Sequence, residues 1–407
     1  MTTLGVCLGI GLLLYFKYLN FFITSFSDLF SAIGLHTNWS TFNIIMPVGI
    51  SFFTFKLISY VLEIYRQRME PVTDIVAFAA YAAFFPTMMA GPIDRPKCLC
   101  SQLQTKHTFD YSLAVDGCRQ ILWGMFKKMV IADNVAVVVD RAWNNIPEMS
   151  GINLVIAVFL YTIQLYADFS GYSDMAIGVG KLLGFRITKN FNYPFFARNI
   201  AEFWRNWHIS LTSWLTDYVF MPLNIKFRNW GKWGTICAII INFVLVGFWH
   251  GANWTFGVFG LYHGLLYIPL ILSGAFAKKN KLTVTKWGLP SPKDFAGMLV
   301  TFVLVTFGNI IFRAGSIGQA WEFMRHIVLN FLPISFASIM AIEGKKAVLG
   351  SIALLAFEWH GRKEEYAIES IGSQWKKPYR WGTYIGIVYL ILTFIQTEGT
   401  PFIYFQF

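Results

Sequence analysis

Residues 236–276 read ICAIIINFVLVGFWHGANWTFGVFGLYHGLLYIPLILSGAF, and this apolar run decides the fold class. A bilayer-spanning helix needs roughly 20 predominantly apolar residues, so the run is long enough for two passes. Backbone amide groups in lipid must pair within the chain, and a helix is the default for an apolar run of this length. The run therefore indicates an all-α integral membrane protein.

Similar runs occur on both sides of this stretch. Long apolar runs occupy residues 4–23, 43–65, 296–313 and 381–397, and shorter or more mixed runs occupy residues 73–92, 118–139, 151–167 and 345–358. By the same length criterion, they predict a polytopic protein with roughly ten transmembrane helices, give or take two. Helical spacing of apolar residues over Ile317–Leu332 predicts an additional interfacial helix.

The composition agrees with this class. Of 407 residues, 56% are hydrophobic and 14% are charged, whereas soluble domains carry about 25% charged residues. No linker, short repeat or glycine-rich phosphate loop divides the chain, so we expect one membrane-embedded domain over residues 1–407. The run Gly5–Phe16 lacks the flanks of a signal peptide and is expected to be a retained first span.

The distribution of charged residues predicts which loops lie on the cytoplasmic side of the membrane and which kinds of partner the chain contacts. The net charge is +11, and the basic residues lie in short loops between the apolar runs. Lys- and Arg-rich loops at residues 278–286 and 362–380 are expected on the cytoplasmic side. The pattern predicts contact with the lipid bilayer and gives no indication of nucleic-acid binding. Five cysteines with no C-x-x-C pair argue against a disulfide framework and a zinc site, so no metal is expected.

Ionisable residues within apolar segments are costly and are functional candidates by default. The first such group is Asp168 and Asp174 in Ala167-Asp-Phe-Ser-Gly-Tyr-Ser-Asp174. Two carboxylates could serve acid/base chemistry, but Gly171 and the hydroxyl residues interrupt the helical pattern. We favour a polar loop or a broken helix in which the two Asp residues cap helix N-termini.

The second group lies in residues 199–218, which read NIAEFWRNWHISLTSWLTDY. Drawn as one helix, the segment places on a single stripe the polar residues Glu202, Arg205, His208, Thr212 and Thr216. Glu202 and Arg205 could then form an i,i+3 ion pair. So polar a stripe predicts a cavity-lining or re-entrant segment, and the alternative is an amphipathic surface helix.

The third group is His250, near the middle of the run that opens this section. Small and aromatic residues surround it in Gly247-Phe-Trp-His-Gly-Ala-Asn-Trp254, and Gly251 would let a backbone or a substrate approach closely. A neutral imidazole can act as a general base toward a hydroxyl group. The alternative is a structural histidine in a bent helix. His263 raises the same question more weakly.

Seven motifs resemble the membrane-bound O-acyltransferase family, and within it the bacterial branch of alginate O-acetyltransferases and D-alanyl-lipoteichoic acid transferases. The motifs are Pro47–Phe55, Met89–Ile93, Asp168–Asp174, Asn190–Pro194, Phe203–Leu211, Phe248–Trp254 and Phe402–Phe407. Residues 4–22 resemble a region some way into the alginate-type proteins, so about one N-terminal hairpin is expected to be absent. The Asp168–Asp174 and Tyr193-Pro194 motifs are closer to the alginate branch.

The resemblance implies a ring of helices around a central tunnel in the cytoplasmic membrane. It implies catalytic roles for His250 and His208. A supporting or tunnel-shaping role is expected for Glu202, Arg205, Asn206, Asp168, Asp174, Trp249 and Asn253. No bound cofactor is expected, and the acyl donor would be a substrate such as acetyl-CoA or another activated carrier. The expected partners are an exported polysaccharide acceptor and an extracytoplasmic protein of the SGNH-hydrolase kind.

The sequence thus favours an O-acyltransferase that moves an acyl group, most simply acetyl, from a cytoplasmic donor toward an exported polysaccharide. D-alanyl transfer to teichoic acid is the alternative within the same enzyme class. A transporter of a small acyl or anionic compound is the alternative from another class, because ionisable residues in broken helices are also typical of transporters.

Overall fold

The computed structural model describes residues 2–35, 37, 39–276, 282–286, 288–331, 342–372, 375–396 and 401–403. Over these residues the secondary structure is helical, apart from an isolated bridge between Val284 and Pro290. The predicted all-α class is therefore confirmed. Parts of two predicted features, the basic loop at 278–286 and the C-terminal motif, lie outside the described residues.

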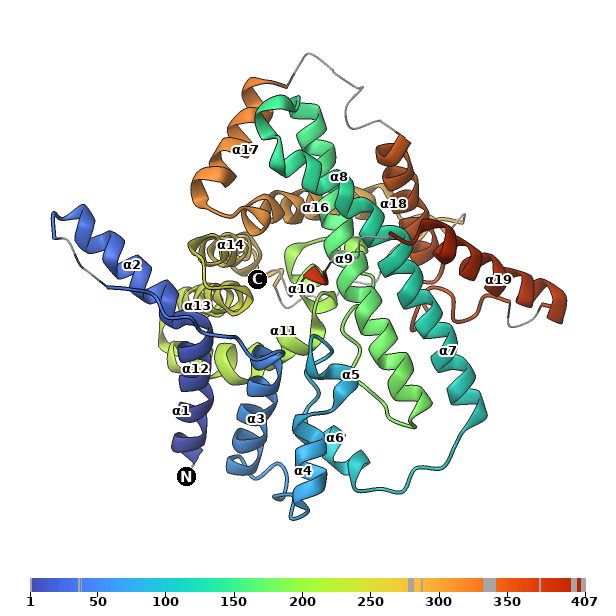
Figure 1. The fold of residues 1–407 in the computed structure, drawn as a ribbon, viewed down its shortest axis with the longest axis horizontal. Coiled ribbons are helices and arrows are strands. Elements are labelled where there is room, and N and C mark those ends of the chain that lie inside the picture. The colour runs from blue at the N-terminus through green and yellow to red at the C-terminus, as the bar shows by residue number, and fades with distance from the viewer. Residues whose placement is uncertain are drawn as a thin grey trace.

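The first half of the chain ends in a helix of 32 residues that lies at the centre of the molecule (Figure 1). Its elements are α1 (Thr2–Leu13), the π-helical turn η1 (Leu14–Tyr18), α2 (Leu19–Ala32), α3 (Ile50–Tyr65), α4 (Ile75–Ala82), α5 (Phe85–Met88), α6 (Pro96–Leu103), α7 (Tyr111–Met125), η2 (Phe126–Ala132), α8 (Asp133–Asn144), η3 (Ile146–Glu148) and α9 (Gly151–Leu182).

The second half wraps around α9 with short helices first and long ones later. Its elements are η4 (Pro194–Phe196), α10 (Ile200–Asn206), α11 (Ile209–Leu215), η5 (Thr216–Phe220), α12 (Met221–Lys226), η6 (Arg228–Trp230), α13 (Lys232–His250), α14 (Trp254–Leu265), α15 (Ile268–Leu272), α16 (Pro292–Arg313), α17 (Ile317–Leu329), α18 (Ile342–His360) and α19 (Lys377–Phe394). Residues 401–403 lie in the middle of the molecule, where Ile403 is buried (Figure 1).

Five described helical segments are long and apolar enough to cross a membrane, fewer than the roughly ten predicted. They are Thr2–Ala32, Gly151–Leu182, Lys232–His250, Trp254–Leu272 and Pro292–Arg313. The run at 43–65 yields only the 16-residue α3, because the chain before Gly49 is not helical. The run at 73–92 divides into two helices of 8 and 4 residues.

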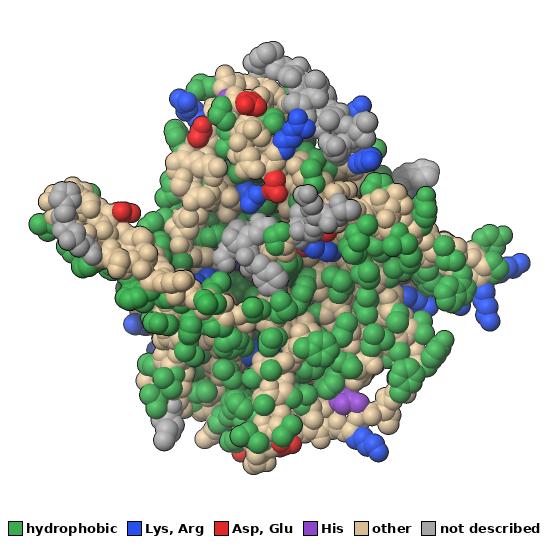
Figure 2. Space-filling view, in the orientation of Figure 1, with side chains coloured by type: hydrophobic (Ala, Val, Ile, Leu, Met, Phe, Trp, Pro, Cys, Tyr) green, Lys and Arg blue, Asp and Glu red, His purple; other side chains and the backbone are tan. Residues whose placement is uncertain are grey.

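Much of the exterior is apolar, as a lipid-facing surface requires. Hydrophobic side chains cover much of the lower half of the face in Figure 2, and charged groups are more frequent in its upper half. Leu8 in α1, Val303 in α16 and Leu392 in α19 are each more than half exposed, at 60%, 56% and 67%. Together with the five apolar helices, this surface identifies a multi-pass membrane protein.

Helix α9 corrects the prediction for Asp168 and Asp174. The helix runs unbroken from Gly151 to Leu182, so neither Asp residue caps a helix N-terminus. Gly171 does not interrupt the helix; a Cβ added there would lie 2.8 Å from the Gly124 carbonyl oxygen of α7. The small residue allows two helix backbones to pack closely, as is common between membrane helices.

Residues 199–218 correct a second prediction. They do not form one helix: α10 ends at Asn206, and α11 starts at Ile209. His208 lies between them with φ of 45°, in the left-handed region. The predicted polar stripe is therefore wrong, because the turn at His208 separates its two halves. The predicted Glu202–Arg205 ion pair is also wrong: both residues lie in α10, but Glu202 pairs with Arg198 and Arg205 donates to the Phe276 carbonyl. The alternative of a single amphipathic surface helix over this segment is wrong for the same reason as the stripe.

Candidate functional site

The candidate site begins where α13 ends. His250 is the last residue of α13, and Asn253 caps α14 by accepting a hydrogen bond from the Thr255 amide at 3.1 Å. The Asn253 side-chain amide also donates to the Gly315 carbonyl at 2.9 Å. The apolar run therefore forms two successive helices, in agreement with the two passes that its length predicts. Gly251 has extended backbone, and the ring of Phe256 fills the space where a Cβ would lie.

His250 lines a cavity of about 250 Å³. Its wall comes from distant parts of the sequence, namely Lys17, residues 46–52, Met89, Trp249 and His250. Segments of three motifs thus converge on one space: Pro47–Phe55, Met89–Ile93 and Phe248–Trp254. Such a cavity, with a few polar groups among apolar ones, is the usual form of a small-molecule site.

One aromatic side chain, that of Trp249, contacts both predicted histidines, His208 and His250. The His208 ring contacts the Trp249 ring with centroids 5.6 Å apart, and Trp249 contacts His250 at 5.0 Å. His208 also packs edge-on against Phe169 of α9 at 4.7 Å. The structure therefore brings together His250, Trp249 and His208, three of the predicted site residues.

The backbone at His208 adopts a left-handed conformation because the chain turns there from α10 into α11. A non-glycine residue with positive φ is uncommon, and such residues cluster at functional sites. Here the left-handed turn lets His208 end one helix and begin the next, and its Nδ1 accepts a hydrogen bond from the Leu211 amide at 3.4 Å. The turn also buries the imidazole completely in the core.

A smaller cavity lies on another side of His250. It holds about 20 Å³, enough for one water molecule. His263 lines it and accepts a hydrogen bond at Nδ1 from the Trp204 indole at 3.2 Å. Asn309 and Thr162, which also line it, are hydrogen-bonded to each other at 3.0 Å. His250 therefore borders both the large and the small cavity.

The loop that carries Met89 is held by buried polar contacts. Lys56 of α3 donates to the Thr87 hydroxyl at 2.7 Å, and the Asp94 carboxylate accepts from the Thr188 amide at 2.9 Å. Burial raises the pKa of Asp94, and the nearby Lys56 charge opposes this shift. These contacts fix one wall of the His250 cavity to α3 and to the chain after α9.

Asp168 is buried and Asp174 is partly buried, and both bind lysines of η2. Lys128 pairs with Asp168 at 2.9 Å, and Lys127 pairs with Asp174 at 2.6 Å. Asp168 also accepts a hydrogen bond from the Ile403 amide at 2.8 Å, which anchors the C-terminal segment. Their observed contacts are therefore those of a structural ion-pair network.

Three other predicted residues do not line the His250 cavity. Glu202 pairs with Arg198 at 3.0 Å, and Arg205 donates to the Phe276 carbonyl at 2.7 Å. The backbone carbonyl of Asn206 accepts from the Asn192 amide at 3.0 Å. These contacts join α10 to the loops around it.

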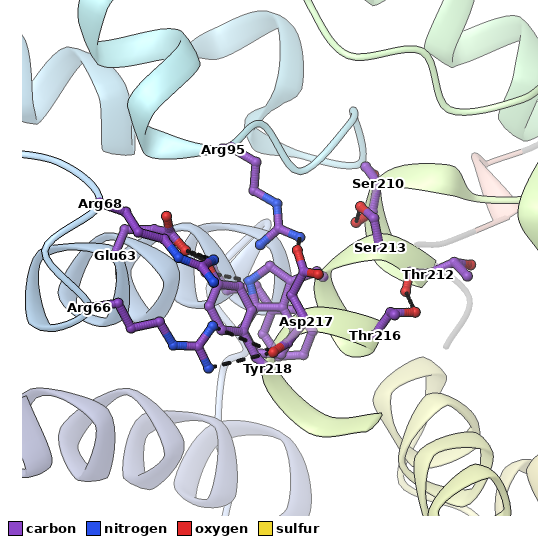
Figure 3. A network of polar contacts seen from close by, with 12 residues as sticks. Glu63, Arg66, Arg68, Arg95, Ser210, Thr212, Ser213, Thr216, Asp217 and Tyr218 are labelled. Atoms are coloured by element: carbon purple, nitrogen blue, oxygen red, sulfur yellow. Dashed lines mark hydrogen bonds and ion pairs between the residues drawn. The ribbon is translucent and has the colours of Figure 1, made fainter. Parts of the chain in front are cut away.

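A polar network at the far end of α3 was not predicted (Figure 3). Arg66 and Arg95 each lie 4.9 Å from the centroid of the Tyr218 ring, and the Tyr218 hydroxyl donates to Glu63 at 2.6 Å. Arg95 also pairs with Asp217 at 2.5 Å. The network fastens η5 to α3 and so supports α11, which His208 caps at its N-terminus.

Lys17 and Ser51 line the cavity and were missed from the sequence. A signal for Lys17 existed, because it is the only Lys, Arg, Asp or Glu before Asp28. Ser51 carries no such signal, since serines are common in spans. Among the described residues, no cluster of three or more His, Cys, Asp or Glu side chains has the geometry to hold a metal ion.

The chain is similar in sequence to known acyltransferases. The model of the membrane-bound O-acyltransferase family matches residues 67–296. The probable alginate O-acetylase AlgI of Pseudomonas putida is 33% identical over 99% of this chain and 84% of its own length. That of Pseudomonas aeruginosa is 38% identical over 78% of this chain but only 58% of its own length. A teichoic acid D-alanyltransferase of Bacillus subtilis is 32% identical over 66% of this chain and 69% of its own.

Proposed function

We propose that this chain, which belongs to the membrane-bound O-acyltransferase family, transfers an acetyl group from a cytoplasmic donor toward an exported polysaccharide. The observation that carries the proposal is the convergence of three distant segments on a cavity that contains His250. Two relatives named as alginate O-acetylases support acetyl as the group and a polysaccharide as the acceptor.

His250 is the general base in this scheme. It accepts the proton of an acceptor hydroxyl group while the hydroxyl oxygen bonds to the acyl carbon. The bond to the leaving group then breaks, and the proton passes from His250 to that group. The donor is acetyl-CoA or another activated carrier, bound as a substrate rather than as a resident cofactor. His208 holds Trp249 and, through it, the orientation of the His250 ring.

The two cavities beside His250 support a path across the protein. Acetylation outside the cell needs an activated donor that is made inside, so an enzyme that spans the cytoplasmic membrane must connect the two sides. We propose a ring of helices around such a tunnel, formed by residues 1–407 as one domain. An extracytoplasmic partner of the SGNH-hydrolase kind would pass the acetyl group to the polymer.

The test uses cells whose own copy of the gene is deleted and replaced by the wild type or by His250→Ala. Acyl groups are released from the surface polysaccharide by mild base and identified by mass, while the membrane abundance of each variant is measured by immunoblot. We expect acetate to be lost with His250→Ala at unchanged abundance. Undiminished acetate in that variant would contradict the proposal.

The same cells separate the alternatives. Release of D-alanine in place of acetate, dependent on His250, would indicate teichoic acid D-alanylation, which the similarity to a D-alanyltransferase makes the second candidate. Purified protein in liposomes addresses transport: labelled acetate or acetyl donor crossing intact, with no covalent acyl product, would indicate a transporter.

A further inference from the structure

The N-terminal helix reaches the end of α13 with two polar side chains. Lys17 donates through Nζ to the carbonyls of Trp249 and His250, at 2.7 and 3.0 Å. The neighbouring Tyr18 hydroxyl donates to the Phe248 carbonyl at 2.6 Å. Carbonyls in the last turn of a helix have no intrahelical partner, so these contacts complete the end of α13 beside His250.

Anchoring alone does not account for a charged residue here. Tyr18 shows that a neutral donor is enough to satisfy one of these carbonyls. An ammonium group in an apolar segment is costly, and intramembrane charges mark functional sites by default. Lys17 also lies in η1, a π-helical turn between α1 and α2, and π-helical turns occur frequently at functional sites.

Lys17 lines the same cavity as His250. An ammonium group has three N–H donors, and the carbonyls of Trp249 and His250 occupy two of them. Among the described residues Nζ has no third hydrogen-bond acceptor, so one donor and the positive charge are available to a molecule in the cavity. The two carbonyls hold the cation in a fixed position relative to the His250 backbone.

We propose that the Lys17 ammonium stabilises the negative charge that forms on the acyl oxygen during transfer. When the acceptor oxygen bonds to the acyl carbon and His250 takes its proton, the electron pair of the C=O bond moves to the acyl oxygen. That oxyanion faces Lys17. The C=O bond then re-forms, the bond to the leaving group breaks, and the leaving group takes the proton from His250. Lys17 keeps its proton throughout.

This inference rests on the proposed function, and its chemistry has general precedent. Preorganised donors aimed at a developing oxyanion contribute more to catalysis than to substrate binding, because the charge exists only in the transition state. Replacement of Lys17 is therefore expected to lower kcat and to change KM for the donor little. A group that only anchored α13 would not produce this separation.

The experiment uses full-length protein in membranes of the producing cells together with their extracytoplasmic fraction, which supplies the partner. Radiolabelled acetyl-CoA is the donor, and the acceptor is surface polysaccharide from the same cells stripped of acyl groups by mild base. We expect Lys17→Met to lower kcat by about 10²- to 10³-fold, as loss of an oxyanion donor does elsewhere, with KM for acetyl-CoA nearly unchanged. Lys17→Arg keeps the charge and should recover most of the rate. Lys17→Gln keeps a hydrogen-bond donor without the charge, so it should show the same kcat loss even if Lys17→Met folds poorly.

The matched control is Lys232→Met. Lys232 also donates to a carbonyl at the end of a helix, that of Leu272 at 2.8 Å, but it is exposed at the opposite end of α13. Its variant should keep the wild-type kcat. Tyr18→Phe removes a neutral contact to the same helix end. It should lower the unfolding temperature and leave kcat close to that of the wild type.

The outcomes separate this inference from the proposed function. Full activity of His250→Ala in the same assay would contradict the proposed function itself. If His250→Ala is inactive while Lys17→Gln and Lys17→Met keep the wild-type kcat, only the role of Lys17 is overturned. It is also overturned if Lys17→Met and Tyr18→Phe lose kcat equally, because a shared loss indicates anchoring alone.

Discussion

Two polar regions within the helical core of this protein differ in what their side chains face. Along α9, Asp168 and Asp174 face lysines of η2, with ion-pair distances of 2.9 and 2.6 Å. At the end of α13, His250 and Lys17 face a cavity of about 250 Å³. The first region binds one helix to another, whereas the second presents a base and a cation to a space that a substrate can occupy.

The difference shows that burial of an ionisable residue in an apolar segment does not by itself identify a site. A buried charge is stable when a partner of opposite charge satisfies it, and it then acts as structure. A buried polar group that lines a cavity keeps capacity for a ligand. Removing groups from the first region should therefore lower stability, and removing groups from the second should lower the rate of transfer.

The largest effect is expected for His208→Asn. Asn tolerates the left-handed backbone at this position and caps helices well, so the turn between α10 and α11 should persist. The imidazole that contacts Trp249 is lost. We expect a fall in acetyl transfer of about 10²-fold, because a catalytic group displaced by about 1 Å loses on this order of rate. A rate near wild type, measured per folded molecule, would show that His208 only shapes the turn.

Asp174→Ala should act on stability instead. It leaves Lys127, whose side chain is 3% exposed, without its carboxylate. Breaking one partner of a buried pair costs about 3–5 kcal/mol, so the thermal unfolding midpoint in detergent should fall sharply. The double variant Lys127→Met, Asp174→Leu should recover most of that loss. Failure of the double variant to recover would mean that the pair contributes more than mutual neutralisation.

Gly171→Val should have a smaller effect of the same kind. The added side chain would meet the Gly124 carbonyl of α7, where a Cβ would lie 2.8 Å away. Overpacking of this sort costs about 1–3 kcal/mol. Gly382→Val in α19 is the matched control, because nothing lies within 4 Å of a Cβ at that position. Equal unfolding midpoints for both variants would contradict close packing of α7 and α9.

Arg95→Ala should have the smallest effect. The Arg95–Asp217 pair is partly exposed, with side chains 26% and 47% accessible. Pairs of this kind contribute up to about 1 kcal/mol. Tyr218 keeps its contacts with Arg66 and Glu63, so η5 should stay in place. A large loss of folded protein in this variant would show that the network in Figure 3 is essential to the fold.

Sequence reasoning anticipated the features that depend on local composition. The all-α membrane class follows from the length of the apolar runs, and the break after His250 follows from its small and polar residues. The continuity of α9 could not be anticipated, because the lysines that satisfy Asp168 and Asp174 lie about forty residues away in the sequence. The turn at His208 depends on a positive φ that spacing alone does not encode.

We infer that the end of α13 performs chemistry, whereas the charged face of α9 provides structure. The most direct test measures acetyl transfer per folded molecule, together with the unfolding midpoint, for His250→Gln and Asp174→Ala. We predict that His250→Gln loses at least about 10²-fold in rate at a nearly unchanged midpoint. We predict that Asp174→Ala keeps its rate at a lower midpoint. The opposite pattern, an active His250→Gln or a stable but inactive Asp174→Ala, would contradict the account.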